Sequence, residues 1–175
     1  MMAHPVIPII RIHAAADLPS QRQAELQTLF DAQFANSSFQ WAAPQWHALA
    51  FVDDAVVSCV RIFERTISAG GQRLRVGGIG GVMTLAEWRH RGLASATLRC
   101  AAEFMRGKLR VESALLLCRD EVALVYAKLG WTEDQGPTTF EQPAGRATYP
   151  RRTMVLIFGE TTWPPGPIDL CGLPW

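Results

Sequence analysis

Residues 89–94, which read Arg-His-Arg-Gly-Leu-Ala, suit the binding of an anionic ligand by the main chain. Gly92 has no Cβ, so the backbone can approach a ligand closely, and a helix that begins directly behind it adds about half a positive charge at its N-terminus. Arg89 and Arg91 add formal charge at the rim. We therefore expect this loop to bind a pyrophosphate. The residues expected to contact it are Arg89, His90, Arg91, Gly92, Leu93 and Ala94.

The segment before this loop is rich in glycine. Gly77, Gly78, Gly80 and Gly81 all lie in one extended stretch, residues 73–84. Glycines inside a strand indicate a bulge or the close approach of another group to the backbone. The sequence therefore predicts an irregular strand that leads directly into the anion-binding loop.

Patterns of apolar residues predict the elements that position the loop. Residues 47–52, 56–68 and 73–84 read as three antiparallel strands, because residues 53–54 and 69–71 separate them at hairpin spacings. Before them we expect a strand at residues 6–13, a helix with Ser20 as its N-cap, and a loop at residues 36–41.

The second half of the chain alternates helices and strands, which is typical of parallel pairing. We expect a helix over residues 94–105 that ends near Gly107, a buried strand over residues 112–118, and a helix from Asp120, its cap, to Gly130. Four prolines in the C-terminal tail argue against a regular helix or a central strand there. The remaining expectations are an extended segment from Trp131 and a last strand at residues 153–158.

Composition indicates one globular domain over residues 1–175. Apolar residues make up 49% of the chain and charged residues 19%, as in soluble proteins. A net charge of +1, with lysine only at positions 108 and 128, argues against a surface that follows nucleic acid. The N-terminus lacks a signal-peptide pattern and no window reaches about 18 uninterrupted apolar residues, so we expect a cytoplasmic protein without a nucleic-acid or membrane partner.

The cysteines and His47 favour structural roles. Cys59, Cys100, Cys118 and Cys171 form no CxxC pair, so reduced thiols are favoured over a disulfide, and we expect no metal site. His47 precedes an apolar strand, which favours a structural histidine over a base.

The loop and a second motif together resemble the GNAT acetyltransferase superfamily. Arg89, Gly92 and Ala94 match its (R/Q)xxGx(G/A) loop, which binds the pyrophosphate of coenzyme A in that family. Residues 126–131, Tyr-Ala-Lys-Leu-Gly-Trp, match its YxxxG(F/W) motif, which closes the thiol end of the site. The resemblance implies acetyl-CoA as co-substrate. It also implies an α+β GNAT fold, in which a mixed sheet of about seven strands splays at the cofactor site and about four helices flank it.

The resemblance also implies roles in acetyl transfer. The backbone of Val82 and Thr84 would bond the pantetheine arm, where their strand splays away from residues 114–117 because of a bulge. The N–H of Met83 would polarise the thioester carbonyl. Tyr126 would give a proton to the departing thiolate. The alternative for Tyr126 is a buried ring in an amphipathic helix.

The general base is harder to assign. Many members of the superfamily carry a glutamate on the strand before the loop, where this chain has Gly80-Gly81. A water chain, a backbone carbonyl or an acid from another segment must then take the proton. The candidate acids are Glu141, Asp169 and the C-terminal carboxylate of Trp175.

The similarity narrows to the aminoglycoside 2'-N-acetyltransferases. It covers most of the chain from Ala14 onward and is carried by His47-Ala48-Leu49, Glu87-Trp88-Arg89, Phe104-Met105-Arg106-Gly107, Gly136-Pro137-Thr138 and a final tryptophan. That family implies a small amino-sugar substrate and antibiotic resistance.

The acceptor groove departs from that family in its charge. The family implies acids that hold the amines of polycationic drugs, but this chain has Arg151-Arg152 and Ser37 in the corresponding stretches. Charge complementarity therefore favours an amino sugar that also carries a carboxylate, such as kasugamycin, acetylated on its 2'-amine. Trp41 and Trp163 could stack on sugars or pack on the core. The residues expected to bind the acceptor are Ser37, Trp41, Gly80, Gly81, Leu117, Arg151, Arg152 and Trp175.

Other readings stay open at this point. The same site could acetylate another small amine or a peptide, or the domain could bind coenzyme A without catalysis. The proline-rich tail could fold back over the acceptor groove, cover an edge strand, or form a homodimer contact.

Overall fold

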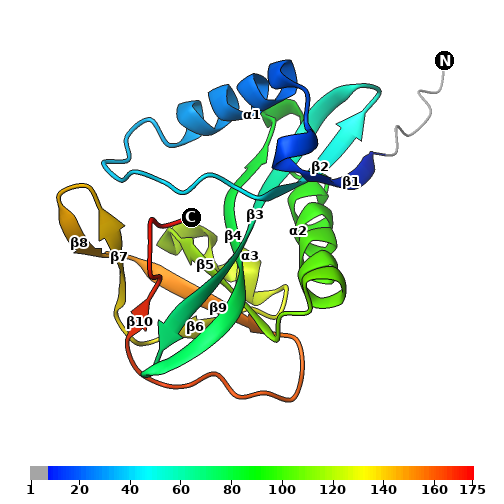
Figure 1. Cartoon of the computed structure of the whole chain (residues 1–175). Helices are drawn as coiled ribbons and strands as arrows, with labels where there is room; N and C mark the ends of the chain where they lie inside the picture. The colour runs from blue at the N-terminus through cyan, green and yellow to red at the C-terminus, as the bar shows by residue number, and fades with distance from the viewer. Residues whose placement is uncertain (1–7) are drawn as a thin grey trace.

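A meander of long antiparallel strands forms the middle of the molecule (Figure 1). The computed structural model describes residues 8–175, so Val6 and Ile7 of the first expected strand lie outside the described residues. Strand β1 (Ile9–Ala14) pairs with β2 (Trp46–Val52), β2 pairs with β3 (Ala55–Ala69), and β3 pairs with β4 (Gln72–Thr84). The meander predicted from the apolar alternation is confirmed.

A second group of strands extends the sheet on both sides of the β3–β4 pair. Strand β5 (Ser113–Cys118) runs parallel to β4, and β9 (Arg152–Ile157) pairs with β5 and with β6 (Thr132–Asp134). On the other side, β10 (Ile168–Asp169) lies between β3 and β7 (Thr138–Gln142), and β7 pairs with β8 (Gly145–Thr148). The strands make one mixed sheet, which confirms the predicted α+β class.

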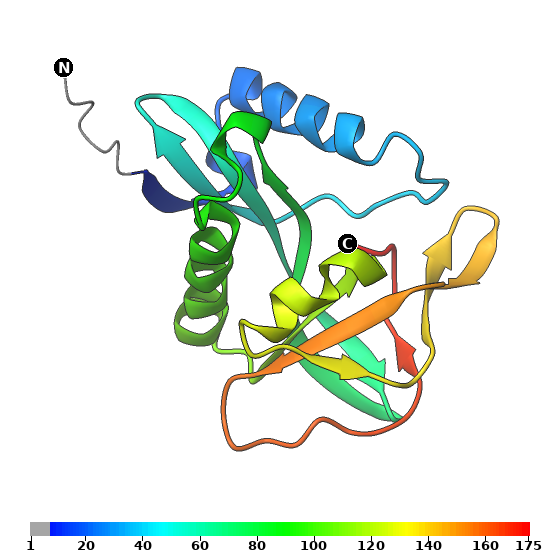
Figure 2. The same cartoon turned by 180° about the vertical axis from the view of Figure 1, so that it is seen from behind.

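Two helices cover opposite faces of β2 and β3. Helix α1 (Ser20–Gln33) packs on the face that carries Leu49 and Cys59. Helix α2 (Leu93–Phe104) packs on the face that carries Ala48 and Val60, because side chains alternate along each strand. The short helix α3 (Ala123–Ala127) lies beside β6 and β9 (Figure 2). In the part of the chain that the structure describes, no helix has the length and apolarity needed to span a membrane.

Strands β4 and β5 separate after a short parallel stretch. They pair at Gly77–Ala114, Gly78–Leu115 and Ile79–Leu116, and β4 has no such pairing with β5 beyond Ile79. A bulge follows at once, because β4 uses one residue more than β3 between their paired positions, and Gly81 has a φ of 52°. The predicted splay and bulge are therefore confirmed.

Several details differ from the expectations. The sheet has ten strands rather than about seven, and three α-helices accompany it in the described residues. Ser20 is the first residue of α1 and provides no side-chain cap, and Asp120 instead accepts a hydrogen bond from Arg152. Residues 153–158 are not the last strand, because the tail forms β10 inside the sheet order. Its prolines flank that two-residue strand, so they do not interrupt its pairing.

Candidate active site

The loop before α2 has the geometry of an anion-binding turn. Gly92 is the residue before the helix and has a φ of 75°, a left-handed conformation that favours glycine. No atom outside its chain neighbours lies within 4 Å of a Cβ built at Gly92, so the backbone faces open space. Arg89, His90 and Arg91 are exposed beside it. The helix N-terminus and the exposed main chain can together accept a negatively charged group.

The two arginines of the loop are held by neighbouring groups. The Nε of Arg89 donates a hydrogen bond to the carbonyl of Thr84 at 3.1 Å. The guanidinium of Arg91 lies over the ring of Trp88 at 4.8 Å from its centroid. Both charges therefore stay next to the loop. Leu93 is buried and Ala94 half-buried, because α2 begins at Leu93.

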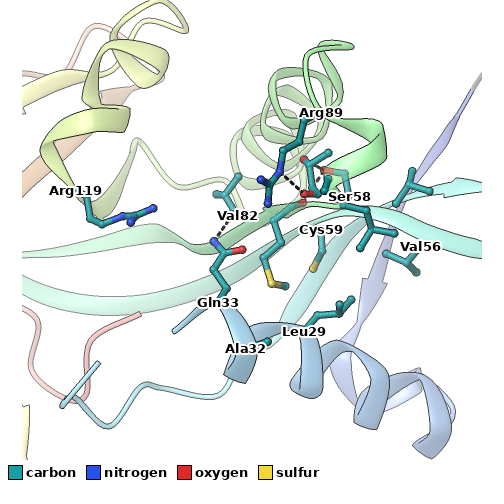
Figure 3. A pocket seen from close by; sticks show the side chains of 14 residues that line it. Leu29, Ala32, Gln33, Val56, Ser58, Cys59, Val82, Arg89 and Arg119 are labelled. Carbon is teal, nitrogen blue, oxygen red and sulfur yellow. Dashed lines mark hydrogen bonds between the residues drawn. The ribbon is translucent and has the colours of Figure 1, made fainter. Parts of the chain in front are cut away.

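A cavity of about 540 Å³ lies beside the loop, between α1, the first part of β3 and the last part of β4. Figure 3 shows Arg89 and Arg119 reaching it from different elements. Val82, Met83 and Thr84, at the end of the strand that leads into the loop, line it. Sequence reasoning missed Arg119, which follows β5 directly and faces the cavity across the splay.

Hydrogen bonds show which backbone groups of β4 face the splay. The carbonyl of Val82 accepts a bond from Nε2 of Gln33 at 3.0 Å, and that of Thr84 accepts from Arg89. The carbonyl of Met83 instead accepts from Oγ of Ser58 on β3, at 2.9 Å. Main-chain groups alternate in direction along a strand, so those of Val82 and Thr84 face away from β3.

This alternation corrects the role expected for Met83. Its N–H faces β3 rather than the cavity, so it is badly placed to polarise a thioester carbonyl there. Gln33 and Ser58 were also missed, because no local pattern in the sequence indicates that α1 and β3 reach the end of β4.

The tail folds back onto the sheet at the point of the splay. The indole of Trp175 lies against Gly78, where a Cβ would come within 2.5 Å of Cε2, and its Nε1 donates to the carbonyl of Leu115 at 3.1 Å. The main-chain carbon of Trp175 would lie 2.6 Å from a Cβ at Gly80. Glycine at these two positions therefore makes room for Trp175, which is 3% exposed.

Arg65 on β3 holds this tail in place. Its Nη1 donates to the carbonyls of Leu170 at 3.1 Å and Leu173 at 2.8 Å, and its guanidinium lies 4.9 Å from the centroid of the Trp175 ring. Two carbonyls and one aromatic face thus fix three points of the tail. Sequence reasoning missed Arg65, since only the folded tail brings its partners together.

Tyr126 lies on α3, next to Trp131 at 6.3 Å between ring centroids. It is 9% exposed, and burial raises its pKa well above the ordinary value. Burial also raises the pKa of Tyr149 to about 12 and that of Cys118 to about 11. Tyr126 is therefore a neutral hydroxyl at every physiological pH, and it can donate a proton or a hydrogen bond.

Comparison with known proteins identifies the family. The profile of the family described as acetyltransferase (GNAT) domain matches residues 11–133. The chain belongs to the GNAT acetyltransferase family. The match spans the splayed strand, the anion-binding loop and the helix that carries Tyr126.

Relatives and solved structures support the same fold. The aminoglycoside 2'-N-acetyltransferase of Mycolicibacterium fortuitum is 28% identical over 116 residues, which cover 66% of this chain and 58% of that protein. Escherichia coli ElaA superposes with a TM-score of 0.64 at 15% identity, covering 86% of this chain and 99% of its own. A GNAT family acetyltransferase of Brucella melitensis, solved with acetyl-CoA, superposes with a TM-score of 0.59 at 17% identity, covering 91% and 94%. The predicted GNAT fold is thus confirmed.

Arg151 and Arg152, which the sequence predicts to bind the acceptor, lie next to acidic side chains in the structure. Arg152 bonds Asp120 through Nε at 2.8 Å and also forms an ion pair with Glu133. The Nη1 of Arg151 lies 3.9 Å from a carboxylate oxygen of Glu121. Both guanidinium groups are thereby partly neutralised near the end of β5, where Leu117 pairs with Thr153.

The loop after α1 is held together by its own side chains. Oγ of Ser37 accepts hydrogen bonds from Nε1 of Trp41 at 3.1 Å and from the N–H of Phe39 at 3.2 Å. Trp41 packs against Phe34 and Phe39 at 5.5 and 5.9 Å between centroids. Trp163 instead bonds Oδ1 of Asp134 at 3.0 Å.

The candidate bases lie in different places. Asp169 forms an ion pair with Arg146 at 2.7 Å, and Glu141 is exposed on β7. Trp175 alone among the three lies against Gly80.

The four cysteines are free thiols, as predicted. His47 is buried, its Nδ1 lies 3.6 Å from Sγ of Cys59, and burial lowers its pKa to about 4, which fits the structural role expected for it.

Proposed function

We propose that this protein transfers an acetyl group from acetyl-CoA to the 2'-amine of an aminoglycoside-type antibiotic, and that the preferred acceptor carries a carboxylate, as kasugamycin does. One observation carries the donor side of this proposal. Beyond Ile79, β4 leaves β5 and presents the backbone of Val82 and Thr84 to a cavity that adjoins the loop at residues 89–94. An extended ligand with a diphosphate at one end fits such a surface.

The donor side fits acetyl-CoA through features of this chain. The open backbone at Gly92 and the start of α2 would hold the diphosphate, with Arg89 and Arg91 beside it. Val82 and Thr84 would bond the amides of the pantetheine arm, and Gln33 would release the carbonyl of Val82 as the arm enters. The family membership and the acetyl-CoA complex of the Brucella melitensis relative support this assignment.

Direct transfer requires three groups around the thioester. The acceptor amine, as a neutral nucleophile, attacks the carbonyl carbon, the C–S bond breaks, and the thiolate takes a proton. We assign the N–H of Val82 to the carbonyl oxygen and the hydroxyl of Tyr126 to the thiolate. The amine proton would leave through water, because Asp169 is paired with Arg146 and Glu141 is exposed on β7.

The acceptor is inferred from the relative in Mycolicibacterium fortuitum and from the sequence similarity described above. A matched pair of acceptors tests it: an aminoglycoside with a 2'-amine and its counterpart with a 2'-hydroxyl. We expect release of coenzyme A thiol only with the 2'-amine, and an amide at that position in the product. Equal rates with both, or acetylation at another amine, would overturn the assignment of the 2'-position.

A further inference from the structure

Arg61 is a buried cation that has no acidic partner among the described residues. It lies on β3, is 5% exposed, and its Nη2 donates one hydrogen bond to the carbonyl of Ala42 at 3.3 Å. Its guanidinium lies over the ring of Phe30, 3.8 Å from the centroid. Among residues 8–175, no carboxylate lies within ion-pair distance of Arg61. Burial lowers its pKa to about 10, so it is still charged at neutral pH.

A small cavity opens onto this cation. It has a volume of about 190 Å³, well above the size of one water molecule, and lies between α1, β2 and the segment that joins them. Gln23, Gln27 and His47 line it together with Arg61. His47 is neutral above its lowered pKa of about 4. Of the residues that line the cavity, Arg61 is therefore the one that carries a charge at neutral pH.

The charges near this cavity are few. Asp31 lies close enough to favour the charged form of Arg61, but its Oδ1 accepts a hydrogen bond from Gln27 at 2.7 Å instead. His13, another titratable group near His47, packs edge-on against Phe51. A cation that is desolvated and not neutralised gains most from an anion that can reach it.

Arg61 lies between this cavity and the bulge of β4. Arg61 is the β3 partner of Gly80, and a Cβ at Gly81 would lie 2.5 Å from Cδ of Arg61. Ala42 connects the two sides, since its carbonyl accepts from Arg61 while its N–H donates to the carbonyl of Pro174 at 2.7 Å. Arg61 thus contacts the bulge through its aliphatic stem and lines the cavity as well.

We infer that Arg61 binds the anionic group of the acceptor, a carboxylate, in the cavity beneath α1. This inference rests on the proposed acetyl transfer and adds its specificity determinant. It also moves the anion-binding role away from Arg151 and Arg152, whose guanidinium groups already contact acids. A carboxylate suits the fork of N–H donors that a guanidinium presents.

The test compares an amino-sugar acceptor that has a carboxylate with its methyl ester. For the unaltered chain we expect kcat/KM at least about tenfold higher for the carboxylate form. Arg61→Met removes the cation at similar length, and it should abolish this preference by lowering kcat/KM for the carboxylate form alone. Gln27→Glu places a negative charge on the cavity wall. It should also reduce the preference, because it repels the carboxylate form of the acceptor.

Gln21→Glu, an equal charge change on an exposed face of α1 outside the cavity, is the matched control and should keep the preference. Equal losses for both acceptors in Arg61→Met, or a preference unaffected by Gln27→Glu, would overturn the inference. If Arg61→Met does not fold, the Gln27→Glu result decides alone. If the unaltered chain acetylates neither form but binds coenzyme A, the proposed function itself fails, which is a different outcome.

Discussion

At the scale of single residues, the donor site depends on atoms with little freedom. The carbonyls of Val82, Met83 and Thr84 each accept a hydrogen bond from a different element, so the end of β4 is fixed before any ligand arrives. A preorganised strand of this kind lowers the cost of binding an extended ligand. A change at Tyr126 tests the chemical step, and a change at Gly92 tests the binding of coenzyme A.

Tyr126→Phe removes the hydroxyl and keeps the ring in its contact with Trp131. We expect the turnover number to fall at least about tenfold, because the thiolate loses its proton donor. The dissociation constant for coenzyme A, measured by calorimetry, should stay within about twofold. An unchanged turnover number would remove Tyr126 from the mechanism.

Gly92→Asp places a carboxylate beside the expected diphosphate, and Gly92→Asn is its neutral counterpart of equal size. Both residues tolerate a φ of 75° better than most, so strain is similar in the two variants. We expect Gly92→Asp to bind coenzyme A at least about tenfold more weakly than Gly92→Asn. Equal affinities in a titration would show that the diphosphate lies elsewhere.

At the scale of elements, the bulge of β4 links the donor site to Arg61. Gly81 has a φ of 52°, and a Cβ there would meet Cδ of Arg61 at 2.5 Å and Cδ2 of Phe30 at 3.0 Å. Replacing it therefore combines backbone strain with a steric clash. Helix α1 would have to move away from the sheet.

Gly81→Ala should lower the free energy of unfolding by more than about 2 kcal/mol. Gly71→Ala is the control, because Gly71 has a φ of 79° but nothing within 4 Å of a Cβ. It should show the strain alone. Chemical denaturation of both variants measures the difference, and equal losses would mean that the space around Gly81 yields without cost.

Elements of different length were predictable to different degrees. The strands β2, β3 and β4 were predicted closely, because each has a long apolar pattern and hairpin residues such as Asp53 and Gly70 between them. The strands β7, β8 and β10 were missed, since each is at most five residues long and pairs with distant segments. Their pairing depends on tertiary contacts that no local pattern contains.

The site was predictable to the same extent. The loop at residues 89–94 and the bulge follow from local glycines, whereas Arg119, Arg61 and Arg65 became visible only in the fold. The sequence around each of these arginines gives no local sign of the distant groups that it meets in the fold. The same holds for Arg151 and Arg152, because their sequence neighbours gave no sign of the acids that pair with them.

At the scale of the whole molecule, buried His47 makes stability depend on pH. Folding lowers its pKa from 6.5 to about 4, chiefly by burial. Between these values the unfolded chain binds a proton that the folded protein does not, so stability is lost as the pH falls from 6.5 toward 4. This one group contributes up to about 3 kcal/mol of that loss.

His47→Gln keeps a neutral hydrogen-bonding group beside Cys59 and removes the titration. We expect the free energy of unfolding of this variant to fall less steeply than that of the unaltered protein between pH 6.5 and pH 4. Urea denaturation at several pH values gives both curves. Parallel curves would mean that His47 titrates alike in the folded and unfolded states.

The most direct test of acetyl transfer is the mass of the acceptor after incubation with acetyl-CoA and this protein. We expect a 2'-amino sugar with a carboxylate to gain one acetyl group as an amide, in equal amount to the coenzyme A thiol released. Binding of coenzyme A without any acetylated product, across a panel of amino sugars, would contradict it.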